Sequence, residues 1–380
     1  MTILTAGRWL WQRRGWGLRL LLLAALLAMV APPPRLLVLG PPQTVATRHP
    51  LVCTHTRLTD EVEPWKVLHT LELVRQMGAP TIVEYFPWAY HEGAAGQFNW
   101  SHAEMRVDFA QNQGLAVIAR LGGLVPAWAR VEPGADPAGG DQIVDTFLPE
   151  ARFADFGEYV FQFVSHFRGR VRAVIIWNEP NVTLEWGFRR VDPEAYTRLL
   201  RIAFERAKAA DPQVLVLGGA LAPTLEPEVS ELALDDLLYL ERMYAAGAGA
   251  FLDGLAAHAY GLKFPPEEPP AADALNFRRV ELLRAIMVRY GDAAKPIYLT
   301  ESGWNDSPRW THAVRPLARV EYQLRAFQWA EANWPYVPAV CVWAFRYPAP
   351  QRSYGDYFTL VTPEFTLKPI YAAIQAWTQE

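Results

Sequence analysis

Residues 171–181 read VRAVIIWNEPN, an apolar run that ends abruptly in a carboxylate and a proline. A short, β-branched and nearly continuous apolar run is typical of a strand covered on both faces, as parallel strands in α/β proteins are. Pro180 lacks an amide hydrogen and favours extended geometry at Glu179, so the chain should leave the strand here rather than continue as a helix. Polar chemistry is therefore expected at the carboxyl end of this strand.

A second stretch of the same design covers residues 295–304, KPIYLTESGW, and its Glu301 lies 122 residues after Glu179. Pro296–Thr300 is the expected strand, and Glu301 follows it. If both strands belong to one parallel barrel, Glu179 and Glu301 emerge at its carboxyl-terminal face, where barrel enzymes place their catalytic groups. Two carboxyl groups, one as acid/base and one as nucleophile, are what glycoside hydrolysis requires.

Eight strands that alternate with helical stretches are expected along the chain. The expected strands are Leu51–Thr56, Ala79–Phe86, Leu115–Leu121, Val171–Ile176, Val214–Gly218, Phe251–Tyr260, Pro296–Thr300 and Ala339–Phe345. This alternation predicts a (β/α)₈ TIM barrel, an α/β fold, as one domain over residues 46–380. The rival fold, an open doubly wound sheet, lacks support because no glycine-rich phosphate-binding turn follows the first strand.

Two helix starts carry local signals. Ser101 with Glu104 three residues later matches a capping box, and Asp192 followed by Pro193 matches a cap with proline at the first helical position. The connection over residues 122–150 is rich in Gly, Pro and Asp, and a loop of that length in a compact domain is usually functional or mobile.

The first 45 residues are distinct in composition. Residues 1–40 hold five arginines and no acidic residue, and an apolar run covers residues 20–31. The segment predicts either a cleaved signal peptide or a retained membrane anchor through residues 18–39, and a buried helix of the main domain fits the three consecutive prolines poorly. Basic residues ahead of the run place the main domain outside the cytoplasm, either extracellular or attached to the outer side of the cytoplasmic membrane.

Charge and cysteine content exclude several functions. The chain holds 36 basic and 40 acidic residues. Without the five N-terminal arginines the remainder carries 31 basic residues and a net charge of −9, which argues against nucleic acid as a partner. Cys53 and Cys341 are too few for a thiolate metal site. They fall on the first and eighth strands, which are neighbours in a closed barrel, so a disulfide is open to them, although two buried thiols are the favoured interpretation.

With the strands placed, the motifs WNEP and TESGW resemble the acid/base and nucleophile motifs of clan A retaining glycoside hydrolases, with families 39 and 5 (β-xylosidase- or cellulase-like) the most similar. His258 and Tyr260 resemble the H-x-Y of the sixth strand in that clan, and Trp343 resembles the tryptophan that ends the eighth. One departure is clear: such barrels often carry an arginine in the second strand, and here Glu84 lies in that strand instead.

The resemblance implies a role for each residue. Glu179 is expected to hold a proton as general acid, helped by partial burial and by the negative charge of Glu301, which must stay ionised as nucleophile. Tyr260 is expected to donate a hydrogen bond to Glu301, and Asn178 to contact the sugar 2-hydroxyl. Retention predicts carboxyl groups about 5–5.5 Å apart. A lone glutamate after a strand is often only a helix cap or ion-pair partner, but two at these strands favour catalysis.

Aromatic residues crowd the expected active face, as in a cleft where rings pack on the apolar faces of sugars. Trp343, Trp88 and Trp304 are predicted to bind substrate together with Asn178, His258 and Tyr260. Further aromatics that follow strands are Tyr90, Trp128, Trp186 and Trp310. No histidine motif for zinc and no serine nucleophile elbow is present, so neither a metal nor a cofactor is predicted.

The sequence thus predicts a retaining β-glycoside hydrolase acting on an oligosaccharide or polysaccharide. The alternative from another class is a non-catalytic carbohydrate-binding cell-surface barrel. The missing second-strand arginine favours that alternative, and the intact Glu179 and Glu301 oppose it. The sugar, the linkage and the choice between chain-internal and chain-end cleavage are not encoded in any motif.

Overall fold

The computed structural model describes residue 16, residues 19–23, residue 26 and residues 37–380. By its internal contacts the chain forms two units, Met1–Gly40 and Pro41–Glu380. In the first unit residues 19–23 are helical, and most of the predicted signal or anchor segment lies outside the described residues. Within the described parts of the chain, no helix is both long enough and apolar enough to cross a lipid bilayer.

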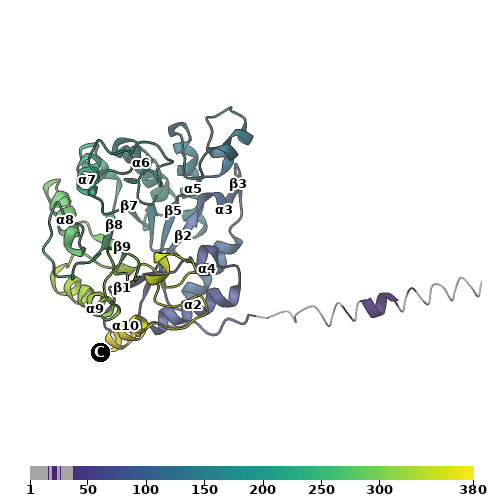
Figure 1. Ribbon diagram of the computed structural model, residues 1–380. Coiled ribbons are helices and arrows are strands. Elements are labelled where there is room, and N and C mark those ends of the chain that lie inside the picture. Colours follow the sequence, from purple (N-terminus) through teal and green to yellow (C-terminus); the bar gives the residue numbers. More distant parts are fainter. Residues whose placement is uncertain (1–15, 17–18, 24–25, 27–36) are drawn as a thin grey trace, which may run out of the picture. The chain divides into compact units, whose positions relative to one another are not determined.

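The second unit is built on a closed parallel barrel, as predicted. Its strands follow the order β1-β10-β9-β8-β7-β6-β5-β2 around the barrel (Figure 1). The strands are β1 (Val52–His55), β2 (Thr81–Pro87), β5 (Ala116–Gly122), β6 (Ala173–Ile176), β7 (Leu215–Leu221), β8 (Gly254–Tyr260), β9 (Ile297–Gly303) and β10 (Val340–Val342). A small antiparallel pair that the sequence did not reveal, β3 (Glu92–Ala94) and β4 (Gln97–Phe98), lies in the connection after β2.

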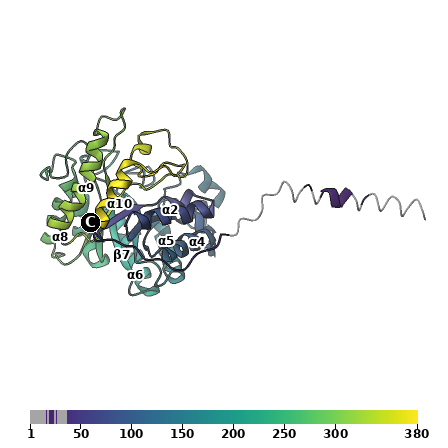
Figure 2. The same ribbon diagram turned by 90° about the horizontal axis from the view of Figure 1, so that it is seen from below.

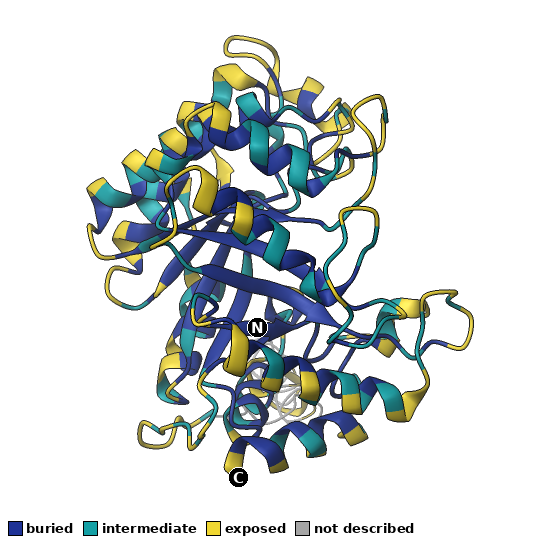
Figure 3. Cartoon of the chain, turned by 90° about the vertical axis from the view of Figure 1, so that its left-hand side faces the viewer, coloured by how far each residue is buried: buried dark blue, intermediate teal, exposed yellow. Residues whose placement is uncertain are grey.

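Helices surround the barrel and cover its outer face (Figure 2). They are α2 (Pro64–Gln76), α4 (Ser101–Asn112), α5 (Phe153–His166), α6 (Pro193–Ala210), α7 (Asp236–Ala245), α8 (Val280–Arg289), α9 (Pro316–Asn333) and α10 (Pro369–Gln379), with the single turn α3 (Trp88–His91) after β2. The strands at the centre are buried, and exposed residues lie on the outer faces of the helices and in the loops (Figure 3).

The two helix starts that carried local signals had different outcomes. Asp192 caps α6 as predicted, because its side chain accepts a hydrogen bond from the amide of Ala195 at 2.8 Å. The capping box at α4 is wrong. Ser101 is already helical there, the cap position is Trp100, and no side chain accepts a capping hydrogen bond. Asn99, two residues before the predicted cap, instead accepts a hydrogen bond from the amide of Ser101.

The barrel interior is filled by side chains that alternate along each strand. They include Val83, Ile118 and Ala256, each fully or almost fully buried. Because side chains in a strand alternate between faces, the residue two positions further along points to the same interior. Arg120 and His258 follow Ile118 and Ala256 in this way, so polar side chains lie on the interior side at the carboxyl ends of these strands.

Cys53 and Cys341 also lie in this interior and form a disulfide between β1 and β10. The two residues are direct register partners in the parallel pair. The predicted adjacency of the first and eighth strands is therefore confirmed, and the favoured interpretation of two reduced thiols is wrong. Strand register brings the two side chains together, which sequence spacing did not reveal.

Glu84 points away from the interior, toward the loop after β1 and toward α4. Its carboxylate is buried and accepts hydrogen bonds from Thr56, from the amide and hydroxyl of Thr59 and from Arg106, whose Nη1 lies 3.0 Å away. Burial alone would raise the pKa of Glu84, but the charge of Arg106 and these hydrogen bonds outweigh it and lower the pKa. Glu84 therefore anchors the β1 loop and is not part of the interior site.

We expect Arg106→Met to lower the free energy of unfolding by about 3–5 kcal/mol, because it leaves the buried carboxylate of Glu84 without its cation. Urea denaturation followed by circular dichroism measures the effect. Arg168→Met, at an exposed arginine, is the matched control and should change stability by less than about 0.5 kcal/mol. A loss from Arg106→Met as small as that of the control would contradict this account of the pair.

Candidate active site

Glu179 lies just past β6, where the backbone turns sharply. Trp177 and Glu179 both have positive φ angles, of 72° and 40°. The expectation that Pro180 keeps Glu179 extended is wrong. The turn is held instead by hydrogen bonds from the amide of Trp177 to the carbonyl of Leu121 (2.8 Å) and from the amide of Glu179 to the carbonyl of Ala220 (3.0 Å). Non-glycine residues in such conformations are uncommon and cluster at functional sites.

Glu301 lies within β9 rather than after it, because the strand continues to Gly303. The pairing of β8 with β9 shifts by one residue, so that Ala257 pairs with Leu299 and His258 pairs with Glu301. A bulge of this kind re-aims the side chains that follow it. Here it sets Glu301 beside His258 at the carboxyl end of the barrel.

Two donors hold the Glu301 carboxylate. Arg120 Nη1 donates to Oε1 at 2.8 Å, and the hydroxyl of Tyr260 donates to Oε2 at 2.7 Å. Burial raises the pKa of Tyr260 well above its ordinary value, and the negative charge of Glu301 adds to this, so the phenol stays a proton donor. The predicted hydrogen bond from Tyr260 to Glu301 is therefore present, and each side-chain oxygen of Glu301 has a donor.

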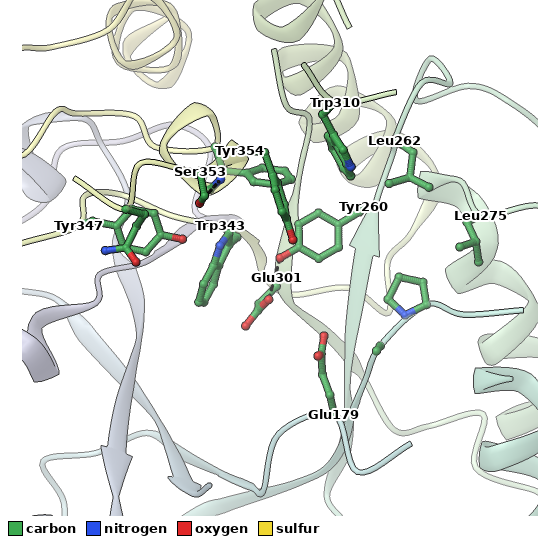
Figure 4. A pocket seen from close by; sticks show the side chains of 15 residues that line it. Glu179, Tyr260, Leu262, Leu275, Glu301, Trp310, Trp343, Tyr347, Ser353 and Tyr354 are labelled. Carbon is green, nitrogen blue, oxygen red and sulfur yellow. Dashed lines mark hydrogen bonds between the residues drawn. The ribbon is translucent and has the colours of Figure 1, made fainter. Parts of the chain in front are cut away.

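His258 bridges the two glutamates. Its Nδ1 lies 2.7 Å from Oε1 of Glu179 and 3.6 Å from Oε2 of Glu301. One side-chain oxygen of each glutamate and a ring nitrogen of His258 all lie within 4.8 Å of one another. Figure 4 shows the carboxyl groups of Glu179 and Glu301 pointing toward one another. The side chain of Glu179 is 24% exposed and that of Glu301 is 8% exposed, so Glu179 is the more open of the two.

The geometry of these three groups would also suit a small cation, which would compete with a proton for the ring of His258. Burial alone would lower the pKa of His258, whereas the charges of Glu301 and Glu179 and the hydrogen bond to Glu179 together raise it. A metal ligand must be a neutral imidazole, and a protonated ring offers no lone pair. The negative charges of Glu179 and Glu301 thus favour a proton on His258 over the neutral ring that a metal ion would need.

Asn178 connects this cluster to a third acid. Its side-chain oxygen accepts a hydrogen bond from Nη1 of Arg120 at 2.8 Å, and its side chain is hydrogen-bonded to Glu185. Burial raises the pKa of Glu185 to about 7, and the charges of Glu179 and Glu301 act in the same direction. Glu185 was not singled out in the sequence, where it looks like any loop glutamate.

We expect Glu185→Gln to remove a pH dependence of stability. Between its ordinary value of 4.5 and about 7, Glu185 binds a proton in the folded chain but not in the unfolded one, so the wild type loses stability as pH rises through this range. The free energy of unfolding of the variant minus that of wild type should be about 3 kcal/mol larger at pH 8 than at pH 4. Denaturant unfolding at the two pH values measures this, with Glu132→Gln, at an exposed glutamate, as control. If the free energy of unfolding changed with pH equally in wild type and in Glu185→Gln, the raised pKa of Glu185 would be contradicted.

Two pockets open next to these residues. The aromatic pocket, of about 490 Å³, is lined by Glu179, Glu301, Trp343 and residues of the loops after β7, β8, β9 and β10. The polar pocket, of about 270 Å³, is lined by Asn178, Arg120, Glu185 and residues of the loops after β1, β2 and β5. The acid pair and its supporting residues therefore lie where the two pockets approach each other.

The predicted substrate-binding tryptophans divide into two groups. Trp343 lines the aromatic pocket (Figure 4). Trp88 is 0% exposed, packs against Tyr159 and donates a hydrogen bond to Glu92. Trp304 is 2% exposed and donates to the carbonyl of Phe264. Neither Trp88 nor Trp304 lines a pocket at the site, so their predicted contact with substrate is corrected: both are core residues.

The most important residue that the sequence did not reveal is Arg120. The second strand lacks the arginine expected from the resemblance, but β2 and β5 are neighbours, and Tyr85 pairs with Arg120 in register. The cation that holds Glu301 therefore comes from the next strand of the barrel. A signal was present in the sequence LAVIARL, since an arginine inside an otherwise apolar strand requires a buried partner.

Comparison with solved structures identifies similar barrels. A family 39 glycoside hydrolase from Bacteroides cellulosilyticus WH2 matches with a TM-score of 0.70 and 20% identity, over 89% of this chain and 65% of that one. A monomeric β-xylosidase from Caulobacter crescentus CB15 matches with a TM-score of 0.59 and 19% identity, over 88% and 69%. A GH5_18 enzyme from Streptomyces cattleya in complex with GlcNAc matches with a TM-score of 0.63 and 16% identity, over 87% and 80%.

This chain has the fold of these enzymes. The structural neighbours come from families 39 and 5, as the sequence motifs indicated. The chain spans less than two thirds of the length of the Bacteroides enzyme. No protein-family model matches the sequence, and no curated protein matches it either.

Proposed function

We propose that this protein is a retaining β-glycoside hydrolase in which Glu179 is the acid/base and Glu301 the nucleophile. The observation that carries the proposal is the close approach of the two carboxyl groups, with side-chain oxygens within 4.8 Å of one another. Retaining enzymes place their carboxyl groups about 5–5.5 Å apart, whereas inverting enzymes need about 6.5–9.5 Å to admit a water molecule. The spacing here suits direct attack by Glu301.

In the first step, Glu301 attacks the anomeric carbon while the proton of Glu179 passes to the glycosidic oxygen. The bond from the anomeric carbon to that oxygen breaks, and the alcohol leaves. In the second step, Glu179 takes a proton from water, the water oxygen attacks the anomeric carbon, and the ester bond to Glu301 breaks. Each carboxyl group ends in its starting form.

The supporting residues fit these roles. Arg120 places a positive charge beside Glu301, and Arg120 and Tyr260 together fix the orientation of its carboxyl group. His258, hydrogen-bonded to Glu179, orients the acid. Asn178 is held by Arg120 and faces the polar pocket, where it is placed to hydrogen-bond a sugar hydroxyl. These contacts pre-position charge for the transition state.

The non-catalytic alternative has lost its main support. It depended on the arginine that is missing from the second strand. Arg120 of β5 now supplies a guanidinium at 2.8 Å from Glu301, so the electrostatic support for a nucleophile is intact.

Covalent labelling tests the proposal. The full-length protein is incubated with a panel of 2-deoxy-2-fluoro glycosyl fluorides, which form the ester quickly and hydrolyse it slowly, and its intact mass is then measured. At least one sugar should raise the mass by one fluoroglycosyl group, and peptide mapping should place the group on Glu301. Absence of any label, in protein shown to be folded by circular dichroism, would contradict the proposal.

We also propose that the protein is exported, as the basic and apolar N-terminal segment predicts. The Cys53–Cys341 disulfide supports this, because structural disulfides persist mainly in oxidising compartments outside the cytoplasm. Protease treatment of intact cells that express the full chain should digest the barrel. Protection of the barrel until the cells are lysed would contradict export.

A further inference from the structure

The aromatic and polar pockets differ in chemistry. The polar pocket presents two cations and two acids, Arg57, Arg120, Asp60 and Glu185, together with the amide of Asn178. Among the residues that line the aromatic pocket in the described part of the chain, Glu179 and Glu301 are the only charged ones. One side of the catalytic pair is therefore built for hydrogen bonds, and the other is mainly apolar.

The positions of Asn178 and Glu179 indicate which part of a glycoside occupies which pocket. In a retaining reaction the nucleophile and the partner of the 2-hydroxyl contact the same sugar ring, and the acid contacts the leaving oxygen. Asn178 lines the polar pocket, whereas Glu179 and Glu301 both line the aromatic pocket. The sugar whose bond is cleaved therefore lies between Asn178 and Glu301, where the two pockets approach each other, and its leaving group extends past Glu179 into the aromatic pocket.

The far wall of the aromatic pocket offers few hydrogen-bond partners. Leu262 and Leu275 lie on the side of the pocket near Trp310, away from Trp343 (Figure 4). Trp310 stacks on Tyr354, with ring centroids 5.1 Å apart and planes 18° apart, and also contacts Phe358 at 5.9 Å. A sugar hydroxyl against the leucines would lose its water without gaining a partner, which is unfavourable, whereas an apolar ring would gain by burial.

We propose that the leaving group of the substrate is an apolar cyclic alcohol, of the aryl or alicyclic class, which binds between the leucines and the Trp310–Tyr354 stack. The inference rests on the proposed glycosidase function. It narrows the expected substrates from oligosaccharides and polysaccharides to glycosides of small hydrophobic alcohols. A pocket of about 490 Å³ is in the size range of sites for small ligands.

The test uses the trapped fluoroglycosyl form of the full-length protein. An acceptor alcohol that binds the aromatic pocket attacks the anomeric carbon, gives its proton to Glu179 and frees the carboxylate of Glu301. Each of four acceptors is added separately at increasing concentration, and the rate at which activity returns is measured. The acceptors are 2-phenylethanol, cyclohexylmethanol, glucose and xylose. The two apolar alcohols should accelerate return of activity with saturation at a concentration at least about tenfold below that of either sugar.

Leu262→Asn is the informative variant. Leu262 has a φ angle of 50°, a conformation that asparagine adopts more readily than leucine, so the variant should fold. It should raise the half-saturating concentration of 2-phenylethanol about tenfold. Leu275→Asn should act in the same direction. Leu232→Asn, at a leucine that is 70% exposed and does not line the pocket, should leave that concentration unchanged.

Two results would overturn the inference. One is reactivation by sugars at lower concentration than by the apolar alcohols. The other is an equal effect of Leu262→Asn and Leu232→Asn. Either can occur while the trapped species forms normally, which leaves the glycosidase function standing. If no trapped species forms with any sugar, the mass spectrum shows it, and the proposed function fails together with the inference.

Discussion

Replacing Glu301 with glutamine should reduce glycoside turnover by roughly 10⁴-fold or more. The amide has the shape of the carboxylate but lacks the charge and nucleophilicity needed to form the glycosyl ester. It still offers an oxygen to Tyr260 or Arg120, so we expect the barrel to stay folded. Initial rates on a glycoside identified by the labelling panel, together with thermal unfolding, measure both effects.

The control for this variant is Glu364→Gln, at an exposed glutamate, which should keep the full rate. The fluoroglycosyl label should form on the control and not on Glu301→Gln. Substantial residual activity in Glu301→Gln, with freshly prepared protein shown by mass to lack deamidation, would remove Glu301 from the role of nucleophile.

Replacing Glu179 with alanine should lower the rate about 10²–10⁴-fold on substrates whose leaving group needs a proton. The loss should be much smaller in the first step for a dinitrophenyl glycoside, because that leaving group departs as an anion without help. The second step should then limit the rate, because no base remains to activate water.

Azide provides the diagnostic readout for Glu179→Ala. The anion needs no general base, so it should attack the anomeric carbon of the glycosyl ester, free Glu301 and restore turnover, with a β-glycosyl azide as product. Glu132→Ala, at an exposed glutamate, should show no response to azide. An α-glycosyl azide, or no acceleration in a folded variant that still forms the ester, would contradict the assigned role.

The barrel and the close approach of Glu179 and Glu301 could be predicted because they depend on local patterns. Apolar strands bounded by turns set the order of the elements, and Glu179 and Glu301 stand in distinctive motifs, one just past β6 and the other within β9. The hydrogen bond from Arg120 to Glu301 could not be predicted from such local patterns. Its partner lies 181 residues away, and only the register between neighbouring strands shows that it replaces the arginine missing from β2.

The aromatic residues show a second limit. Trp88 and Trp343 both follow or end strands, yet Trp88 is in the core and Trp343 lines a pocket. The difference depends on whether a helix covers the ring: Trp88 packs against Phe156 and Tyr159, which belong to α5. The residues next to each tryptophan in the sequence do not indicate whether a helix will pack over its ring. The turn at Glu179 is similar, since hydrogen bonds to distant carbonyls override the local preference set by Pro180.

The bond between Cys53 and Cys341 changes the topology of the molecule. It joins residues separated by 288 positions, so the chain between them is a covalent ring. Glu179, Glu301, Arg120 and His258 all belong to that ring. A single proteolytic cut in a loop of the ring, such as the long connection between β5 and α5, opens the circle without dividing the molecule. The two parts of the candidate site then remain covalently joined through the barrel interior, and only a cut combined with reduction separates them covalently.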